Sequence, residues 1–208
     1  MKSIRCLLLP SIVILLALLA GCASPKATLK YTPVAAVPTI YNTTEAAPRI
    51  AVVDFSYPQS EMGEAKFTVF NTWDMEVDEI LSDDDLGLIF AEATVDALRK
   101  SGVQADVLTL SEYQATANVY DGLLTGNIQT AEIHLKAGWG TVGITAQTTT
   151  LITLEMHGMT QTYGPIISGS SQSGSGYNIH SQYSLAIDGS IQDYVRQFIR
   201  LMKTENAF

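Results

Sequence analysis

A glycine-rich stretch, GWGTVG at residues 138–143, has the G-x-G-x-x-G spacing of a dinucleotide-binding loop. Phosphate binding at such a loop requires a helix that begins within the motif and directs its first N–H groups at the anion. The residues that follow instead alternate between apolar and polar, which predicts a strand. We therefore interpret the glycines as a hairpin turn. Trp139 is then a candidate partner-binding residue, the alternative being that it folds back on the core.

Three other groups of polar residues lack the spacing of a known site. His134, His157 and His180 match no zinc pattern, although the first two could approach one another on neighbouring strands. The serines of 168–178 lack the second glycine of a nucleophile elbow, so a Ser/Gly loop is predicted. The acids of 61–85 lack the glycine of a calcium loop and are interpreted as solvated surface and a helix cap, with a weak cation site or a basic partner as the alternative. No catalytic residue, metal site or cofactor is predicted.

The amino terminus carries chemistry of a different kind. Two cations precede an apolar run over 6–20, which is shorter than the roughly 20 residues that span a bilayer and has the layout of a secretory signal. The run ends in Leu-Ala-Gly-Cys, which matches the bacterial lipobox. This motif predicts a signal peptide over 1–21, cleavage between Gly21 and Cys22, and a diacylglycerol on the Cys22 thiol. The alternatives are an ordinary signal peptide or an uncleaved anchor.

Cysteine use and charge limit the function further. The chain has two cysteines, of which Cys6 leaves with the signal and Cys22 is blocked by lipid, so thiol catalysis and cysteine metal sites are excluded. The formal net charge is −9, and the signal removes cations only. An acidic domain lacks the electrostatic footprint of nucleic-acid binding, so no nucleic-acid partner is predicted.

Composition divides the mature chain into two parts. Residues 22–48 hold the lipidated Cys and many Pro, Ala and Thr residues, and they are predicted to form a flexible Pro-rich tether. Residues 49–208 have the size of one globular α+β domain. A helix is expected over 86–102, where apolar residues recur at three- and four-residue spacing after an acidic cap and before Gly102.

Strands are expected on both sides of this helix. Residues 49–56 and 103–110 are short apolar runs, which with the helix suggest a βαβ-like unit. The intervening segment, 57–85, forms either a hairpin or an irregular insertion. A short helix is expected at 111–117.

In the second half of the domain, apolar and polar residues alternate strictly. Strands are expected at 123–137, 141–158 and 160–170, with one wet face. A helix within 182–203 closes the chain and buries Ile187, Ile191, Val195 or Tyr194, Phe198 and Met202. The predicted fold is α+β: a single two-layer sandwich, with a mainly antiparallel sheet of about five strands and two main helices packed on one face.

The closing stretches TTTLITLEMHGMTQTYGPIISGSSQSGSG (148–176) and AIDGSIQDYVRQFI (186–199) resemble the YajG-like family of bacterial outer-membrane lipoproteins. The resemblance covers roughly residues 15–200, and segment 57–85 departs from it. Ala23 after the lipidated Cys, by resemblance to enterobacterial lipoproteins, favours the outer membrane. The family implies partner binding and supplies no catalytic residues.

We therefore expect a non-enzymatic lipoprotein, lipid-anchored at the periplasmic face of the outer membrane and acting as a protein-binding accessory module of the envelope. Its partners would be the membrane, through the anchor, and an envelope protein whose identity the sequence leaves open. One alternative is an oligomerising subunit of a secretion or export assembly, in which the chain forms a homo-oligomer. The other is an envelope hydrolase with a dispersed active site.

Overall fold

The structure is a computed structural model that describes residues 26–41, 46–57, 65–175 and 179–208. The predicted signal peptide and the cleavage site between Gly21 and Cys22 lie outside these ranges, so lipidation stays a prediction. Among the helices within them, none is long and apolar enough to cross a membrane.

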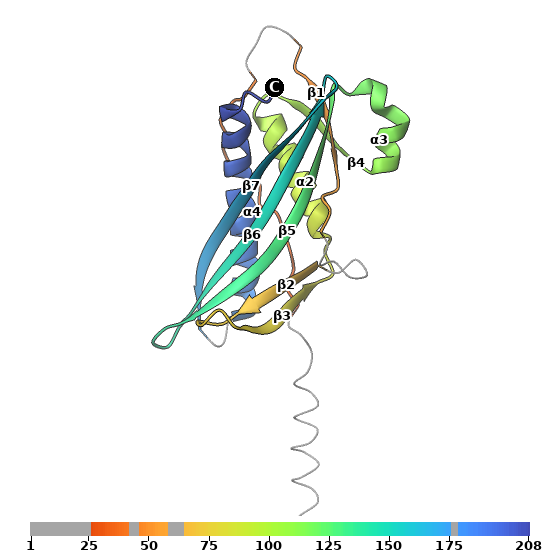
Figure 1. Ribbon diagram of the computed structural model, residues 1–208. Coiled ribbons are helices and arrows are strands. Elements are labelled where there is room, and N and C mark those ends of the chain that lie inside the picture. Colours follow the sequence, from red (N-terminus) through yellow and green to blue (C-terminus); the bar gives the residue numbers. More distant parts are fainter. Residues whose placement is uncertain (1–25, 42–45, 58–64, 176–178) are drawn as a thin grey trace, which may run out of the picture.

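One long antiparallel meander forms the centre of the fold (Figure 1). It consists of β5 (Gly122–Ala137), β6 (Val142–Met156) and β7 (Met159–Gly174), which pair in that order. Alternate residues of β6 are buried, as the period-two pattern predicts. β7 runs to Gly174, so residues 168–174 are strand rather than the predicted Ser/Gly loop. Ser168 shares a buried hydrogen bond of 2.7 Å with Thr148 of β6, which shows how small polar side chains satisfy one another inside the sheet.

The edge of β5 away from β6 is divided between two strands. β1 (Arg49–Val53) pairs in parallel with residues 122–124, and β2 (Ala65–Phe70) pairs in parallel with residues 132–134. β4 (Gln104–Leu108) extends β1 in parallel, and β3 (Glu76–Ser82) extends β2 as an antiparallel hairpin. The result is a curled, mixed sheet of seven strands.

The predicted sheet of about five mainly antiparallel strands was therefore too small and too simple. A strand as long as β5 can pair with two short strands in succession along one edge, and each of these recruits a further strand. The βαβ-like unit is confirmed as β1, α2 and β4, and segment 65–82 forms the hairpin alternative of the prediction.

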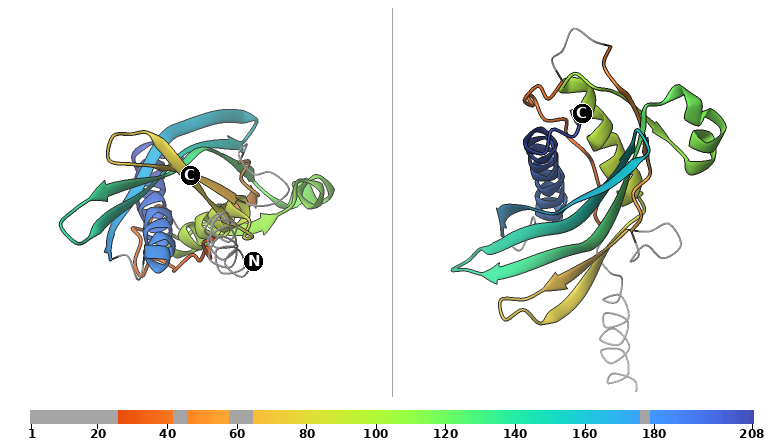
Figure 2. Two further views of the ribbon diagram at one scale, coloured as in Figure 1. Left: turned by 90° about the horizontal axis from the view of Figure 1, so that it is seen from below. Right: turned by 45° about the horizontal axis from the view of Figure 1, so that its top comes forward.

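Two helices cover one face of the sheet, as predicted (Figure 2). α2 (Leu86–Lys100) begins at Asp85, whose carboxylate accepts a hydrogen bond from the Leu88 N–H. α4 (Ile179–Thr204) packs on β6, β7 and α2 and buries the predicted apolar stripe. A third helix, α3 (Leu110–Thr116), is followed by a 3₁₀ turn, η1 (Ala117–Val119). It lies beside β1 and β4, at the end of the sheet away from the β2–β3 hairpin turn (Figure 1).

The segment expected to be a flexible tether packs on the domain for most of its described length. We call residues 26–41 the strap. Ala27, Leu29 and Val34 are buried in the core, and the Ala27 N–H donates to the Leu81 carbonyl of β3 at 2.9 Å. Extended chain can pack in this way because its side chains point alternately into and away from the domain, while its backbone N–H groups need acceptors outside the segment.

Acidic side chains of the domain supply those acceptors. The Leu29 N–H donates to Asp84 at 2.8 Å, and the Thr32 N–H donates to Asp188 of α4 at 2.7 Å. Lys100 of α2 donates in return to the Val34 carbonyl at 2.8 Å. Part of the acidic surface therefore holds the strap in place, a role that composition alone did not indicate.

Leu29→Ala should lower the free energy of unfolding by about 2–3 kcal/mol, because it removes a buried side chain and leaves a cavity. Leu110→Ala on α3 is the matched control, since Leu110 is exposed and its loss should change stability by less than about 0.5 kcal/mol. Urea denaturation of the purified variants measures both values. Equal, negligible effects would show that the strap does not dock.

Candidate functional site

Two hairpin turns project side by side from one end of the sheet (Figure 2). One joins β2 to β3 over residues 71–75, and the other joins β5 to β6 over residues 138–141. Each carries one of the two tryptophans of the chain, Trp73 and Trp139. We call this region the tryptophan end.

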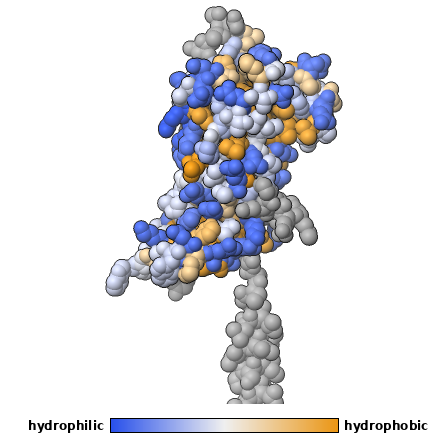
Figure 3. All heavy atoms as spheres, in the orientation of Figure 1, coloured by the Kyte–Doolittle hydropathy of each residue, from blue (hydrophilic) through white to orange (hydrophobic). Residues whose placement is uncertain are grey.

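The predicted hairpin at the glycine-rich stretch is confirmed, and Trp139 stands at its tip. The Gly138 N–H donates to the Thr141 carbonyl at 2.9 Å, and Gly140 has a φ of 73°, which glycine adopts without strain. Trp139 is 104% exposed, so it does not fold back on the core. Figure 3 shows the β5–β6 turn as a narrow projection from the body of the molecule.

Trp73 was not singled out in the sequence, because segment 57–85 had no clear periodicity. Asn71 opens its turn: the Asn71 side-chain oxygen accepts from the N–H groups of Trp73 at 2.9 Å and Met75 at 3.2 Å. The Asn71 N–H also donates to the Met75 carbonyl at 2.9 Å. An asparagine that closes a turn on its own backbone was the available signal, and it holds Trp73 outward, 77% exposed.

The Trp73 turn is bound to the end of β5, which leads directly into the Trp139 turn. The Thr72 hydroxyl donates to the Leu135 carbonyl at 3.2 Å and accepts from the Ala137 N–H at 3.1 Å. Behind it, the ring of Phe70 stacks on His134 with centroids 5.1 Å apart. Both tryptophans are therefore carried on one braced platform.

The histidines do not assemble into a site. His134 pairs with Thr145 near the tryptophan end, whereas His157 lies in the β6–β7 turn at the opposite end of the same strands, so the suggested approach of the two is wrong. His134 instead contacts Glu132 at 3.2 Å. The His180 side chain lies outside the described residues. No group of three or more metal-ligating side chains occurs among the residues that the structure describes.

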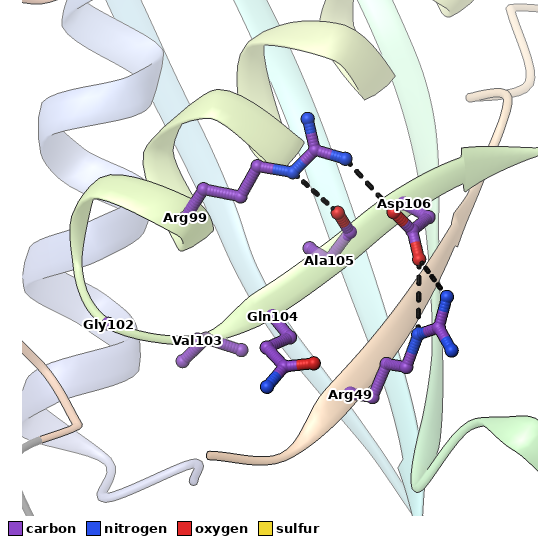
Figure 4. A pocket seen from close by; sticks show the side chains of 7 residues that line it. All are labelled: Arg49, Arg99, Gly102, Val103, Gln104, Ala105 and Asp106. Carbon is purple, nitrogen blue, oxygen red and sulfur yellow. Dashed lines mark hydrogen bonds and ion pairs between the residues drawn. The ribbon is translucent and has the colours of Figure 1, made fainter.

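A shallow groove of about 390 Å³ lies at the end of the sheet opposite the tryptophans, lined by Arg49, Arg99, Gly102, Val103, Gln104, Ala105 and Asp106 (Figure 4). Asp106 accepts from Arg49 through Nε at 3.2 Å and Nη2 at 2.9 Å. Arg99 donates to the other Asp106 oxygen at 2.9 Å and to the Ala105 carbonyl at 2.7 Å. Two guanidinium groups thus share one carboxylate, which leaves the cluster with net positive charge.

The electrostatics of this groove are set by Asp106. Hydrogen bonds from Arg49, and then from Arg99 and Tyr120, hold the pKa of the Asp106 carboxyl below its ordinary value, although desolvation opposes them. The Arg49 guanidinium also lies over the Tyr120 ring, 4.8 Å from its centroid. The groove can therefore receive an acidic side chain from a partner, and it offers no nucleophile.

Comparison with known proteins identifies no family. No family model and no curated protein sequence matches the chain. Solved structures with a similar arrangement include a Xanthomonas campestris protein of family DUF330, which is 12% identical over 89% of this chain and 100% of that one, with a TM-score of 0.49. A hypothetical protein of Chlamydia trachomatis is 13% identical over 76% and 99% of the two chains, with a TM-score of 0.44.

A third similar structure is the PelC dodecamer of Paraburkholderia phytofirmans. It is 15% identical over 71% of this chain and 89% of that one, with a TM-score of 0.30. None of these three descriptions names the YajG-like family, so that resemblance stays a prediction.

Asp106→Asn should destabilise the protein by about 1 kcal/mol at pH 7, because charge-assisted bonds are lost at a partly exposed site. A carboxyl whose folded pKa is depressed contributes stability above its unfolded pKa and loses it as the pH falls through its folded pKa. The difference from wild type should therefore shrink below about pH 4. Urea denaturation across this range measures it, with the exposed Glu76→Gln as the control. A difference independent of pH would contradict the assignment.

Proposed function

We propose that this protein is a bacterial envelope lipoprotein, anchored through Cys22 to the periplasmic face of the outer membrane, whose domain is a non-enzymatic binding module. The lipobox ending at Cys22 is the observation that carries the proposal. Acyl chains on one residue anchor a protein stably, since each buried CH₂ contributes about 0.8 kcal/mol. The docked strap supports a fixed placement of the domain, because at most four residue steps separate Cys22 from Lys26, which is bound to Leu81 of β3.

Two surfaces are available for recognition, one at each end of the sheet. The tryptophan end offers large, exposed aromatic side chains of the kind that anchor interfaces. The groove around Arg49, Arg99 and Asp106, which we call the arginine groove, offers paired guanidinium groups for an acidic segment of an envelope protein. The acidic balance of the whole chain argues against a nucleic-acid partner.

A second candidate function is an oligomerising subunit of an export assembly. It is favoured by β3, which ends the strand order of the sheet and exposes Glu76, Val77 and Asp78. An edge strand presents backbone groups that can pair with another copy, although acidic side chains oppose close approach.

Cys22→Ala should abolish labelling of the protein by a palmitate analogue and release it from the membrane fraction, because the acceptor thiol is lost. Cys6→Ala is the matched control: Cys6 lies in the predicted signal and should leave labelling intact. Gel fluorescence after metabolic labelling, with membrane fractionation, measures both effects. Labelling that survives Cys22→Ala would overturn the anchor.

Val77→Cys separates the two candidate functions, because the lipidated chain has no other free thiol. The oligomer alternative predicts disulfide-linked dimers when membranes are oxidised, since neighbouring edge strands bring Cβ atoms within bonding distance. A single-copy binding module predicts none. Val119→Cys, similarly exposed on η1, is the control for random collision. Non-reducing gels provide the measurement.

A further inference from the structure

We propose that the tryptophan end rests on the surface of the bilayer that holds the lipid anchor, with Trp73 and Trp139 lying at the membrane–water interface. This inference rests on the proposed function, because it assumes that Cys22 is lipidated. It assigns a lipid surface as the binding partner of the exposed aromatic side chains.

The path of the strap brings the anchor to this end of the molecule. Lys26 pairs with Leu81 of β3 in a parallel bridge. β3 runs away from the turn that carries Trp73, so the parallel strap does the same. The amino-terminal end of the strap is therefore the end nearer to that turn.

The length of chain before the strap limits how far the domain can stand from the membrane. Four residue steps separate Cys22 from Lys26, and at most about 3.6 Å per step gives a reach of about 14 Å. Five steps along β3 from Leu81 back to Glu76 cover a similar distance, about 17 Å at 3.3 Å per residue. The bilayer surface is thus held within reach of the tryptophan turns, whereas α3 lies at the far end of the sheet.

The side chains at this end suit a membrane interface. Tryptophan combines an apolar ring with an N–H donor and is enriched where hydrocarbon meets water. Both tryptophans of the chain lie here, and Met75 and Val77 beside Trp73 are also exposed. The hydrogen bonds of Thr72 hold the Trp73 turn against the end of β5 that leads into the Trp139 turn, which lowers the conformational entropy cost of bringing both rings to one plane.

Charge selects the kind of lipid. Asp74, Glu76 and Asp78 are exposed around the Trp73 turn, and Lys136 lies near the Trp139 turn. This acidic surround would be repelled by anionic headgroups. The surface therefore fits a zwitterionic leaflet, and binding to it comes from the aromatic rings and the anchor rather than from charge attraction.

An orientation follows for the rest of the domain. With the tryptophan end on the bilayer, α3 and the arginine groove lie at the distal end and face the periplasm. The groove that fits an acidic partner is then the accessible one, and the two ends of the sheet have separate roles.

The test uses the full-length lipidated protein in zwitterionic vesicles whose acyl chains carry bromine near the headgroups, which quenches tryptophan at short range. Trp73→Phe and Trp139→Phe each leave one reporter. Both remaining tryptophans should lose emission relative to unbrominated vesicles. In the unbrominated vesicles their emission should also lie to the blue of that from a tryptophan placed in water at the far end of the sheet. Adding anionic phosphatidylglycerol should weaken the quenching.

The control moves the reporter to the far end of the sheet. Leu110→Trp in the Trp73→Phe, Trp139→Phe background should be unquenched. Quenching of Trp73 and Trp139 no stronger than that of this control overturns the inference. Vesicle flotation of the same samples distinguishes failure of the orientation from failure of the proposed function. A chain that floats with its tryptophans unquenched overturns only the orientation. A chain that carries no acyl groups and does not float overturns the proposed function as well.

Discussion

The fold depends on a close contact between Phe55 and Gly126, where β5 passes from one strand partner to the next. A Cβ on residue 126 would lie 2.2 Å from the Phe55 ring, so only glycine admits it. The ring reaches Phe90 of α2 and Tyr194 of α4, with centroids 6.2 and 6.3 Å away. This contact fixes both helices against the sheet at the point where β1 ends and the path toward β2 begins, because the aromatic rings fill the space that the missing side chain leaves.

Two strands, β1 and β2, share one edge of β5. The two ends of the sheet therefore carry chemically different surfaces. β1 and β4 present Arg49 and Asp106 at one end, where the guanidinium groups share a carboxylate. β2 and β3 present the rigid turn of Trp73 at the other end, beside that of Trp139. A sheet with a single partner along that edge would present only one of these ends. The architecture therefore allows one molecule to meet two different environments.

The strap converts a lipid anchor into a constraint on orientation. A flexible segment over 22–48 would let the domain turn freely, whereas docking at Lys26, Leu29 and Thr32 limits any free stem after Cys22 to at most a few residues. A short stem raises the effective concentration, at the bilayer, of the part of the domain that lies closest to the anchor. The hydrogen bonds from the strap to Asp84 and Asp188 show that acidic side chains can hold extended backbone in place while remaining at the surface.

The sequence by itself determined several of the elements and predicted the anchor. Asp85 as a cap, the strict alternation of β6, the apolar stripe of α4 and the hairpin at Trp139 all follow from interactions between residues close in the chain, which local patterns record. Only the tertiary structure decided that residues 26–41 dock, that Trp73 stands beside Trp139 and that His134 and His157 lie apart. Each of these depends on contacts between segments distant in the chain, such as Leu29 with Asp84 and Thr72 with Leu135. Composition cannot report such contacts, because the same Pro-rich segment is a tether in water and a packed strap when a groove lined by acceptors lies within its reach.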